Sequence, residues 1–157
     1  MNWDLEPYFV EFNGLAMSSF KAKLEEDAAG LLKRASELGT LNAENAEDWE
    51  TVFLKDEELG TRYSHLGSYL GCLTSADAAN EGYKMEEAAF SRATAEGVKI
   101  NVELLRGLKD ATDSDFEAFV ERPAMVSARF SLEFKRQDAQ FAMSPEQESV
   151  AADLSVD

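Results

Sequence analysis

Two side chains have the chemistry of nucleophilic catalysis, namely the single histidine, His65, and the single cysteine, Cys72. Activation of a thiol by an imidazole requires a hydrogen bond between the two side chains. Their seven-residue separation corresponds to two helical turns, roughly 10 Å along the axis, which is too far for such a bond. We therefore interpret both as ordinary packing positions on a helix.

The sequence lacks the residues of the common metal and phosphate sites. One histidine cannot supply a His-Glu-x-x-His zinc helix, and one cysteine excludes both a cysteine-rich zinc site and an intramolecular disulfide. The acidic runs Glu25–Asp27 and Asp56–Glu58 lack the spacing of a calcium loop and are typical of a solvated helix face. No nucleotide loop or serine-hydrolase elbow occurs. We predict no catalytic, cofactor-binding or metal-binding residue in this chain.

The chain is strongly acidic, which limits its partners. Its 157 residues carry 31 Asp and Glu against 15 Lys and Arg, a formal net charge of −16. Such a field repels phosphate backbones and anionic lipids, so we expect neither nucleic acid nor a membrane as partner. The hydrophobic share of 45% is that of a globular protein. The cysteine usage and the N-terminal sequence, which is unlike a signal peptide, predict a cytoplasmic location.

Helical periodicity dominates the chain. Apolar residues recur three and four positions apart, and no segment alternates as a strand would. We predict an all-α fold, an elongated antiparallel bundle of three long helices plus two or three short C-terminal helices, in a single helical domain over 1–157. The three long helices are expected over about 14–38, over an apolar stripe from Trp49 to Leu73 with Asn45 as N-cap, and over about 82–110. A short helix is expected to begin at Ser114–Glu117 and to end before Pro123. Further helices are expected over 124–137 and from Ser144, where a capping pattern occurs.

Three residue groups allow a structural and a functional interpretation, and for each we favour the structural one. Small residues within the second helix indicate close approach of another helix, with an open groove as the alternative. Aromatic residues near the start are expected to anchor the N-terminal segment across the bundle. Four later phenylalanines are expected in the core, with an exposed binding surface as the alternative. The three groups are Gly60, Gly67, Ser68, Gly71 and Ser75; Trp3, Tyr8, Phe9 and Phe12; and Phe116, Phe119, Phe130 and Phe134.

Four stretches, in matching order, resemble the N-terminal region of oligoendopeptidase F, a bacterial zinc metallopeptidase family related to thimet oligopeptidase. They are Trp3–Phe9, Phe20–Leu24, Leu66–Leu70 with Thr74–Asp77, and Met143–Glu148. The resemblance implies that this chain is the N-terminal, non-catalytic helical domain of a larger peptidase and forms part of the wall of its substrate channel. Residues 139–157 would begin the next segment of the parent chain.

The same resemblance implies the chemistry of the parent. Zinc would be held by a His-Glu-x-x-His helix beyond Asp157, with the glutamate acting as general base on zinc-bound water. No position of this chain matches that motif, so we expect the domain alone to be inactive and to bind no cofactor. Its partners would be the remainder of the peptidase and oligopeptide substrates. The alternatives are a free-standing acidic helical module that binds a protein partner without enzymatic activity, and a homo-oligomer joined through the same faces.

Overall fold

The fold of the computed structural model is all-α, as predicted, and residues 5–141 are described. Within this range no strand occurs, whereas Trp3 and the helix expected from Ser144 lie outside it. The chain divides into two compact units, which are described separately below. Unit 1 comprises Met1–Gly39 and Glu47–Leu104, and unit 2 comprises Thr40–Ala46 and Leu105–Asp157.

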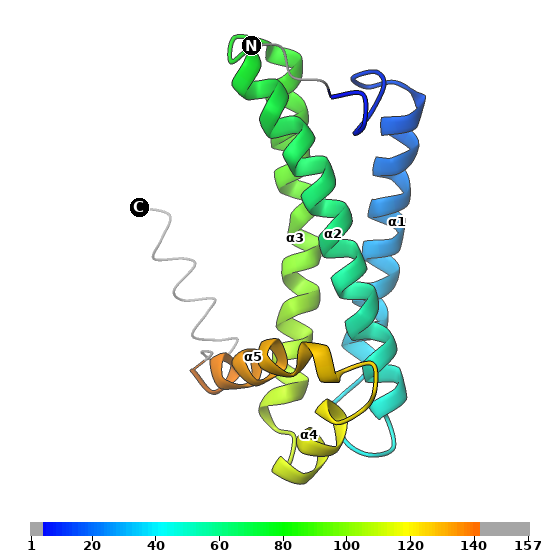
Figure 1. The fold of residues 1–157 in the computed structure, drawn as a ribbon, viewed down its shortest axis with the longest axis vertical. Coiled ribbons are helices and arrows are strands. Elements are labelled where there is room, and N and C mark those ends of the chain that lie inside the picture. Colours follow the sequence, from blue (N-terminus) through cyan, green and yellow to red (C-terminus); the bar gives the residue numbers. More distant parts are fainter. Residues whose placement is uncertain (1–4, 142–157) are drawn as a thin grey trace. The chain divides into compact units, whose positions relative to one another are not determined.

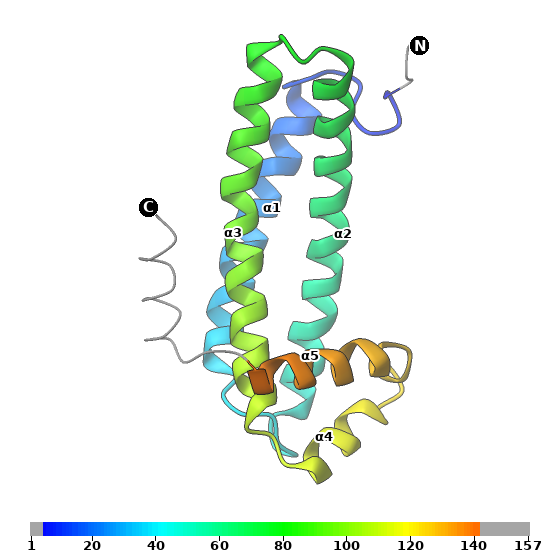
Figure 2. The same ribbon diagram turned by 90° about the vertical axis from the view of Figure 1, so that its left-hand side faces the viewer.

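Three long helices that pack against each other form unit 1 (Figures 1 and 2). They are α1 (Leu15–Glu37), α2 (Ala46–Ala76) and α3 (Glu81–Lys109), of which the last residues of α3 belong to unit 2. Each boundary lies close to the predicted one, and consecutive helices run antiparallel because their connections are short. On α1 the apolar residues Leu24, Ala28, Leu31 and Ala35, which recur three and four positions apart, are buried. The most deeply buried side chains include Met17, Leu24, Trp49, Phe53, Leu70, Ile100 and Leu104.

The end of α1 and the start of α2 follow the expected signals. Gly39 has a φ of +66°, the left-handed conformation that glycine adopts without strain after a helix. The second helix begins directly after Asn45, whose side-chain oxygen accepts a hydrogen bond of 2.9 Å from the backbone N–H of Asn42. This amide thus closes the loop that leads into α2.

Unit 2 contains α4 (Asp113–Val120), a 3₁₀ turn η1 (Val126–Ala128) and α5 (Arg129–Phe141). The prediction that Ser114 opens α4 is wrong, because Thr112 is the N-cap. The Thr112 hydroxyl oxygen accepts from the N–H of Asp115 at 3.1 Å and donates to the Asp115 carboxylate at 2.6 Å. The reciprocal cap therefore lies two residues earlier than the sequence pattern indicated. Across residues 5–141, no helix is both long and apolar enough to span a membrane.

Candidate functional site

His65 lies in an aromatic cluster at one end of unit 1. Its ring centroid is 4.9 Å from that of Tyr8, 5.3 Å from Phe9 and 5.5 Å from Phe20. Phe9 is buried and also packs edge-on against Tyr69 at 5.1 Å. The histidine thus packs among aromatic rings, and Tyr8 and Phe9 anchor the N-terminal segment.

Phe12 extends this anchoring to α3. Its ring meets that of Tyr83 edge-on, with 4.8 Å between centroids. The segment before α1 thus contacts rings from all three long helices, because Phe20 lies on α1 and His65 on α2. Cys72, two helical turns after His65 on α2, is half-buried. Among residues 5–141, no group of three or more His, Cys, Asp or Glu side chains is placed to hold a metal ion.

A groove of about 420 Å³, lined mostly by charged residues, runs between α1 and α2. Its wall combines cationic and anionic side chains, and the buried leucines Leu31 and Leu59 lie beneath them. The Cβ position of Gly30 meets open space, which leaves the groove unobstructed on the α1 side. Both signs of charge are available, so the groove suits polar or zwitterionic groups rather than a strongly anionic ligand. The charged lining residues are Glu26, Asp27, Arg34, Lys55, Glu58 and Arg62.

Asp27 organises the charges of this groove. Its carboxylate accepts from Arg62 Nη1 at 2.7 Å and lies 2.9 Å from Lys23 Nζ. These hydrogen bonds, of which that from Arg62 is the larger influence, hold the pKa of Asp27 below its ordinary value. Asp27 therefore forms an ion pair with Arg62 that links α1 to α2. The other two residues of this acidic run, Glu25 and Glu26, are exposed, as expected for a solvated helix face.

A wider groove of about 770 Å³ lies between α2 and α3 and is lined largely by small and polar residues. Gly60 lines it, and a Cβ at this position would meet nothing within 4 Å. Tyr63 donates its hydroxyl to the carbonyl of Ala93 at 3.2 Å. Burial, reinforced by the neighbouring carboxylate of Glu96, raises the pKa of Tyr63.

The small residues of α2 do not all serve one purpose. A Cβ on Gly67 would lie 3.0 Å from Cε1 of Phe90, so close approach by α3 accounts for this glycine. Gly60 and Gly71 face open space instead. Close approach of another helix, the favoured interpretation, thus applies to Gly67, whereas Gly60 lines an open groove, which was the alternative.

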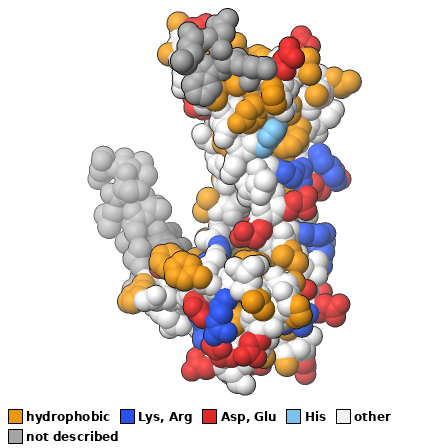
Figure 3. All heavy atoms as spheres, viewed as in Figure 1, with side chains coloured by type: hydrophobic (Ala, Val, Ile, Leu, Met, Phe, Trp, Pro, Cys, Tyr) orange, Lys and Arg blue, Asp and Glu red, His pale blue; other side chains and the backbone are white. Residues whose placement is uncertain are grey.

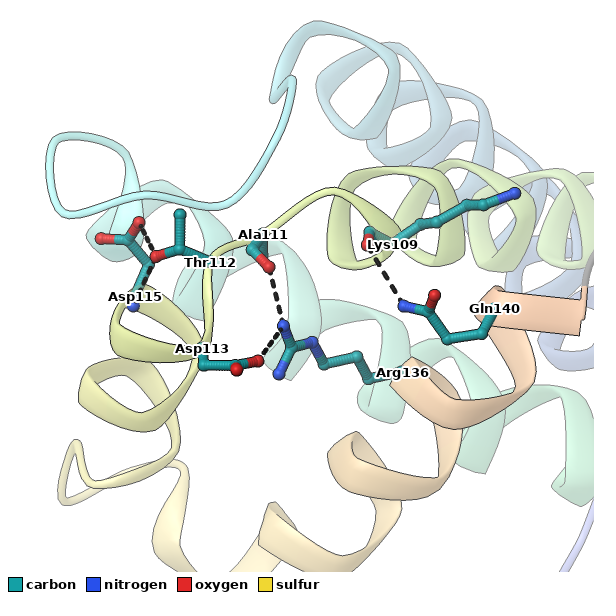
Figure 4. A network of polar contacts seen from close by, with 7 residues as sticks. All are labelled: Lys109, Ala111, Thr112, Asp113, Asp115, Arg136 and Gln140. Atoms are coloured by element: carbon teal, nitrogen blue, oxygen red, sulfur yellow. Dashed lines mark hydrogen bonds and ion pairs between the residues drawn. The ribbon is translucent and has the colours of Figure 1, made fainter.

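In unit 2, a network of polar contacts centred on Arg136 fastens α5 to the residues that join α3 to α4 (Figure 4). Arg136 Nη2 donates to the carbonyl of Ala111 at 2.7 Å and to Asp113 Oδ1 at 2.9 Å. Its guanidinium lies 4.6 Å from the ring centroid of Phe116. Gln140 donates to the carbonyl of Lys109 at 3.3 Å. We call these contacts the Arg136 network.

The expectation that four phenylalanines belong to the core is correct for Phe116 and Phe119 and wrong for the other two. Phe130 is 81% exposed and Phe134 is 56% exposed. α5 buries Leu132 and Ala139, which lie on its opposite face. One helix cannot bury both faces against the same neighbour. The helical angles of these residues were the signal in the sequence that could have identified the exposed face.

No protein-family model matches the chain, and no curated protein or solved structure shows significant similarity to it. A function must therefore be argued from the residues of this chain, their geometry and the motifs described above. Within residues 5–141, the two grooves of unit 1 and the exposed face of α5 are candidate surfaces for binding a peptide or a protein.

Proposed function

We propose that this chain is the N-terminal helical domain of a zinc-dependent oligoendopeptidase, that it forms part of the substrate-channel wall, and that it is inactive alone. The observation that carries the proposal is the convergence of three of the four resembling stretches. Phe9 of the first stretch contacts Phe20 of the second at 5.4 Å and Tyr69 of the third at 5.1 Å. Residues that resemble one family in separate parts of the chain thus form a single packing unit.

Leu24 and Leu66, from the second and third stretches, are also buried. Apolar residues of neighbouring helices meet in the core of any bundle, so this shared core is what the proposed common fold requires, and the family itself is proposed on the motifs. The resemblance then supplies the activity of the parent, hydrolysis of short peptides at a zinc ion held elsewhere in the polypeptide.

The grooves of unit 1 are compatible with a channel wall. The groove between α1 and α2 carries both signs of charge, and the groove between α2 and α3 is wide and lined by small residues. Such surfaces contact extended peptides without demanding one sequence. The excess of acidic residues would draw cationic peptides toward them.

The proposal is tested by the reading frame that contains this chain. We expect it to continue beyond Asp157 into a segment with a His-Glu-x-x-His motif, and the purified product to bind zinc and cleave short peptides. Replacing the glutamate of that motif by glutamine is expected to abolish cleavage, whereas residues 1–157 alone are expected to show neither activity nor stoichiometric zinc. A frame without a metallopeptidase segment, or peptide hydrolysis by residues 1–157 after removal of contaminating proteases, contradicts the proposal.

The exposure of Phe130 and Phe134 favours a second candidate, a free-standing acidic module that binds a protein partner. On this account the reading frame closes at Asp157, and the exposed face of α5 captures a partner in solution. A protein partner recovered with the chain, and lost on Phe130→Ser, would favour this candidate over the first.

A further inference from the structure

The groove between α1 and α2 contains two cationic side chains at facing positions. Asp27 on α1 pairs with Arg62 on α2 at 2.7 Å, which fixes the register of these antiparallel helices. Seven residues farther along, on the same helix faces, lie Arg34 of α1 and Lys55 of α2, and both line the groove. They are therefore at the same level, roughly 10 Å along the axis from the ion pair. Figure 3 shows Lys and Arg side chains beside Asp and Glu side chains over α1 and α2.

The contacts of the fold do not account for these two cations. Within residues 5–141, the side chains of Arg34 and Lys55 form no hydrogen bond or ion pair, although the chain carries 31 Asp and Glu against 15 Lys and Arg. Arg34 is in the last turn of α1, where the helix dipole favours a cation, but Lys55 is in the interior of α2. Like charges at facing positions repel each other, whereas an anion between them would be attracted by both.

The groove offers an apolar floor and open space beside the cations. Leu31 and Leu59 are buried and line the groove, whose volume of about 420 Å³ is toward the small end of ligand pockets. A Cβ on Gly30, in the same turn of α1 as Leu31, would meet nothing within 4 Å. Packing therefore does not require this glycine, which weakens the helix interior and leaves the space above the leucines open. Such a floor suits a small apolar side chain.

The acidic residues of the groove restrict the kind of anion. Glu58 lines the groove one turn from Lys55, roughly 4.5 Å along the axis, and its carboxylate forms no ion pair within residues 5–141. A ligand with net negative charge is repelled by the net charge of −16, whereas a zwitterion is not. The separation is within reach of the two termini of a dipeptide, whose residues span at most roughly 3.5 Å each.

We propose that this groove binds a dipeptide with apolar side chains. Arg34 and Lys55 bind its carboxylate, the leucine floor contacts a side chain, and Glu58 pairs with its ammonium group. A guanidinium can donate two parallel hydrogen bonds to a carboxylate, and the lysine adds a charge from the other helix. The inference goes beyond the proposed function, because the groove lies within unit 1 and needs no catalytic residue.

The test is a titration of residues 1–157 with the dipeptide Leu-Leu, followed by the backbone amide signals in NMR spectra. We expect saturable shifts at the residues that line the groove. The C-terminal amide of Leu-Leu, which lacks the carboxylate, is expected to bind at least about fivefold more weakly. N-acetyl-Leu-Leu, which lacks the ammonium group, should also bind more weakly. Attraction by the acidic surface alone would instead favour the amide, because the amide carries a net positive charge.

Variants of the chain test the assigned residues. Arg34→Gln and Lys55→Gln are each expected to weaken Leu-Leu binding at least about fivefold. Lys33→Gln removes one exposed cation of α1 that does not line the groove, and it should leave binding unchanged. Gly30→Leu fills the open space without changing any charge and should abolish saturable binding, while leucine favours the helix.

Three results would overturn the inference. They are the absence of saturable shifts up to the solubility limit of Leu-Leu, binding of the amide as tight as that of Leu-Leu, and unchanged binding in both Arg34→Gln and Lys55→Gln. None of them bears on whether the complete reading frame encodes a zinc peptidase. Conversely, a frame without a peptidase segment would overturn the proposed function and leave dipeptide binding by residues 1–157 intact.

Discussion

At the scale of single residues, the contacts observed among residues 5–141 are those of packing and ion pairing. His65 is surrounded by aromatic rings, and the acidic run at residues 25–27 contributes Asp27 to an interhelical pair with Arg62. The sequence predicted the packing role of His65 because a lone histidine in an apolar helical stripe has few chemical alternatives. It did not predict the Asp27 pair, since contacts between distant helices depend on their rotation about their axes.

The Asp27 pair makes a prediction about stability and pH. Asp27→Asn is expected to lower the free energy of unfolding by less than about 1 kcal/mol at neutral pH, because the pair is only partly shielded from solvent. The pKa of this carboxyl is lowered in the folded state, so its contribution is present above the ordinary carboxyl range and is lost as pH falls through the lowered pKa, below about pH 4.

Urea unfolding of the two proteins at neutral pH and at about pH 3 measures this difference. Glu26→Gln is the matched control, because Glu26 is exposed and pairs only with Lys23 three residues away. It should leave the stability almost unchanged. A deficit in Asp27→Asn that grew as the pH was lowered would contradict the assignment.

At the scale of elements, the positions of the helices could be predicted from apolar periodicity and from local end signals, whereas the contacts between helices could not. Gly39 ends its helix as expected, whereas the cap of α4 falls on Thr112 rather than Ser114. Both residues precede an acidic side chain that can complete a cap, so local sequence leaves the choice open. The exposed face of α5 was missed because phenylalanine predicts burial, whereas the Arg136 network determines which face is covered.

Two of the three glycines of α2, Gly67 and Gly71, provide a test of helix packing. Gly71→Ala is expected to raise the free energy of unfolding by up to about 1 kcal/mol, because alanine favours the helix and the added methyl group meets open space. Gly67→Ala gains the same propensity but places a methyl group 3.0 Å from the ring of Phe90. Its stability should therefore be lower than that of Gly71→Ala. Equal gains from both substitutions in thermal or urea unfolding would contradict close packing at Gly67.

The Arg136 network makes a second prediction at this scale. Arg136→Ala is expected to lower the free energy of unfolding by about 1.5–3 kcal/mol, because the charged hydrogen bond to the Ala111 carbonyl and the contact with Phe116 are lost. Asp113→Asn is the control, since the Asp113 side chain is 95% exposed and its ion pair contributes little. Urea unfolding followed by a probe in unit 2 measures both. If Asp113→Asn lowered the free energy of unfolding as much as Arg136→Ala, the ion pair with Asp113 would be the main source of the stabilisation instead.

At the scale of the whole molecule, the chain is strongly acidic and all-α, and the proposed peptidase activity would require catalytic residues outside these 157. The all-α class was predictable, because composition and three-to-four spacing suffice for it. The grooves and the exposed face of α5 were not, since they depend on how helices pack rather than on where helices form. The proposed activity rests on the resemblance, whose first three stretches meet around Phe9.

The acidic surface predicts a salt effect on the parent enzyme. If the grooves line the substrate channel, peptides rich in Lys or Arg should be cleaved with a higher kcat/KM than neutral peptides of equal length, and this preference should decline as ionic strength rises from about 0.01 M to 0.5 M. The neutral peptide serves as control. A preference that did not change with salt would indicate that the field of this domain does not act on the substrate.

The proposed function is tested most directly by the zinc content and peptide hydrolysis of the protein made from the complete reading frame. We expect about one zinc ion per chain, cleavage of short peptides, loss of cleavage when a chelator removes the metal, and neither property in residues 1–157 alone. A complete product that binds no zinc and cleaves no peptide would contradict it.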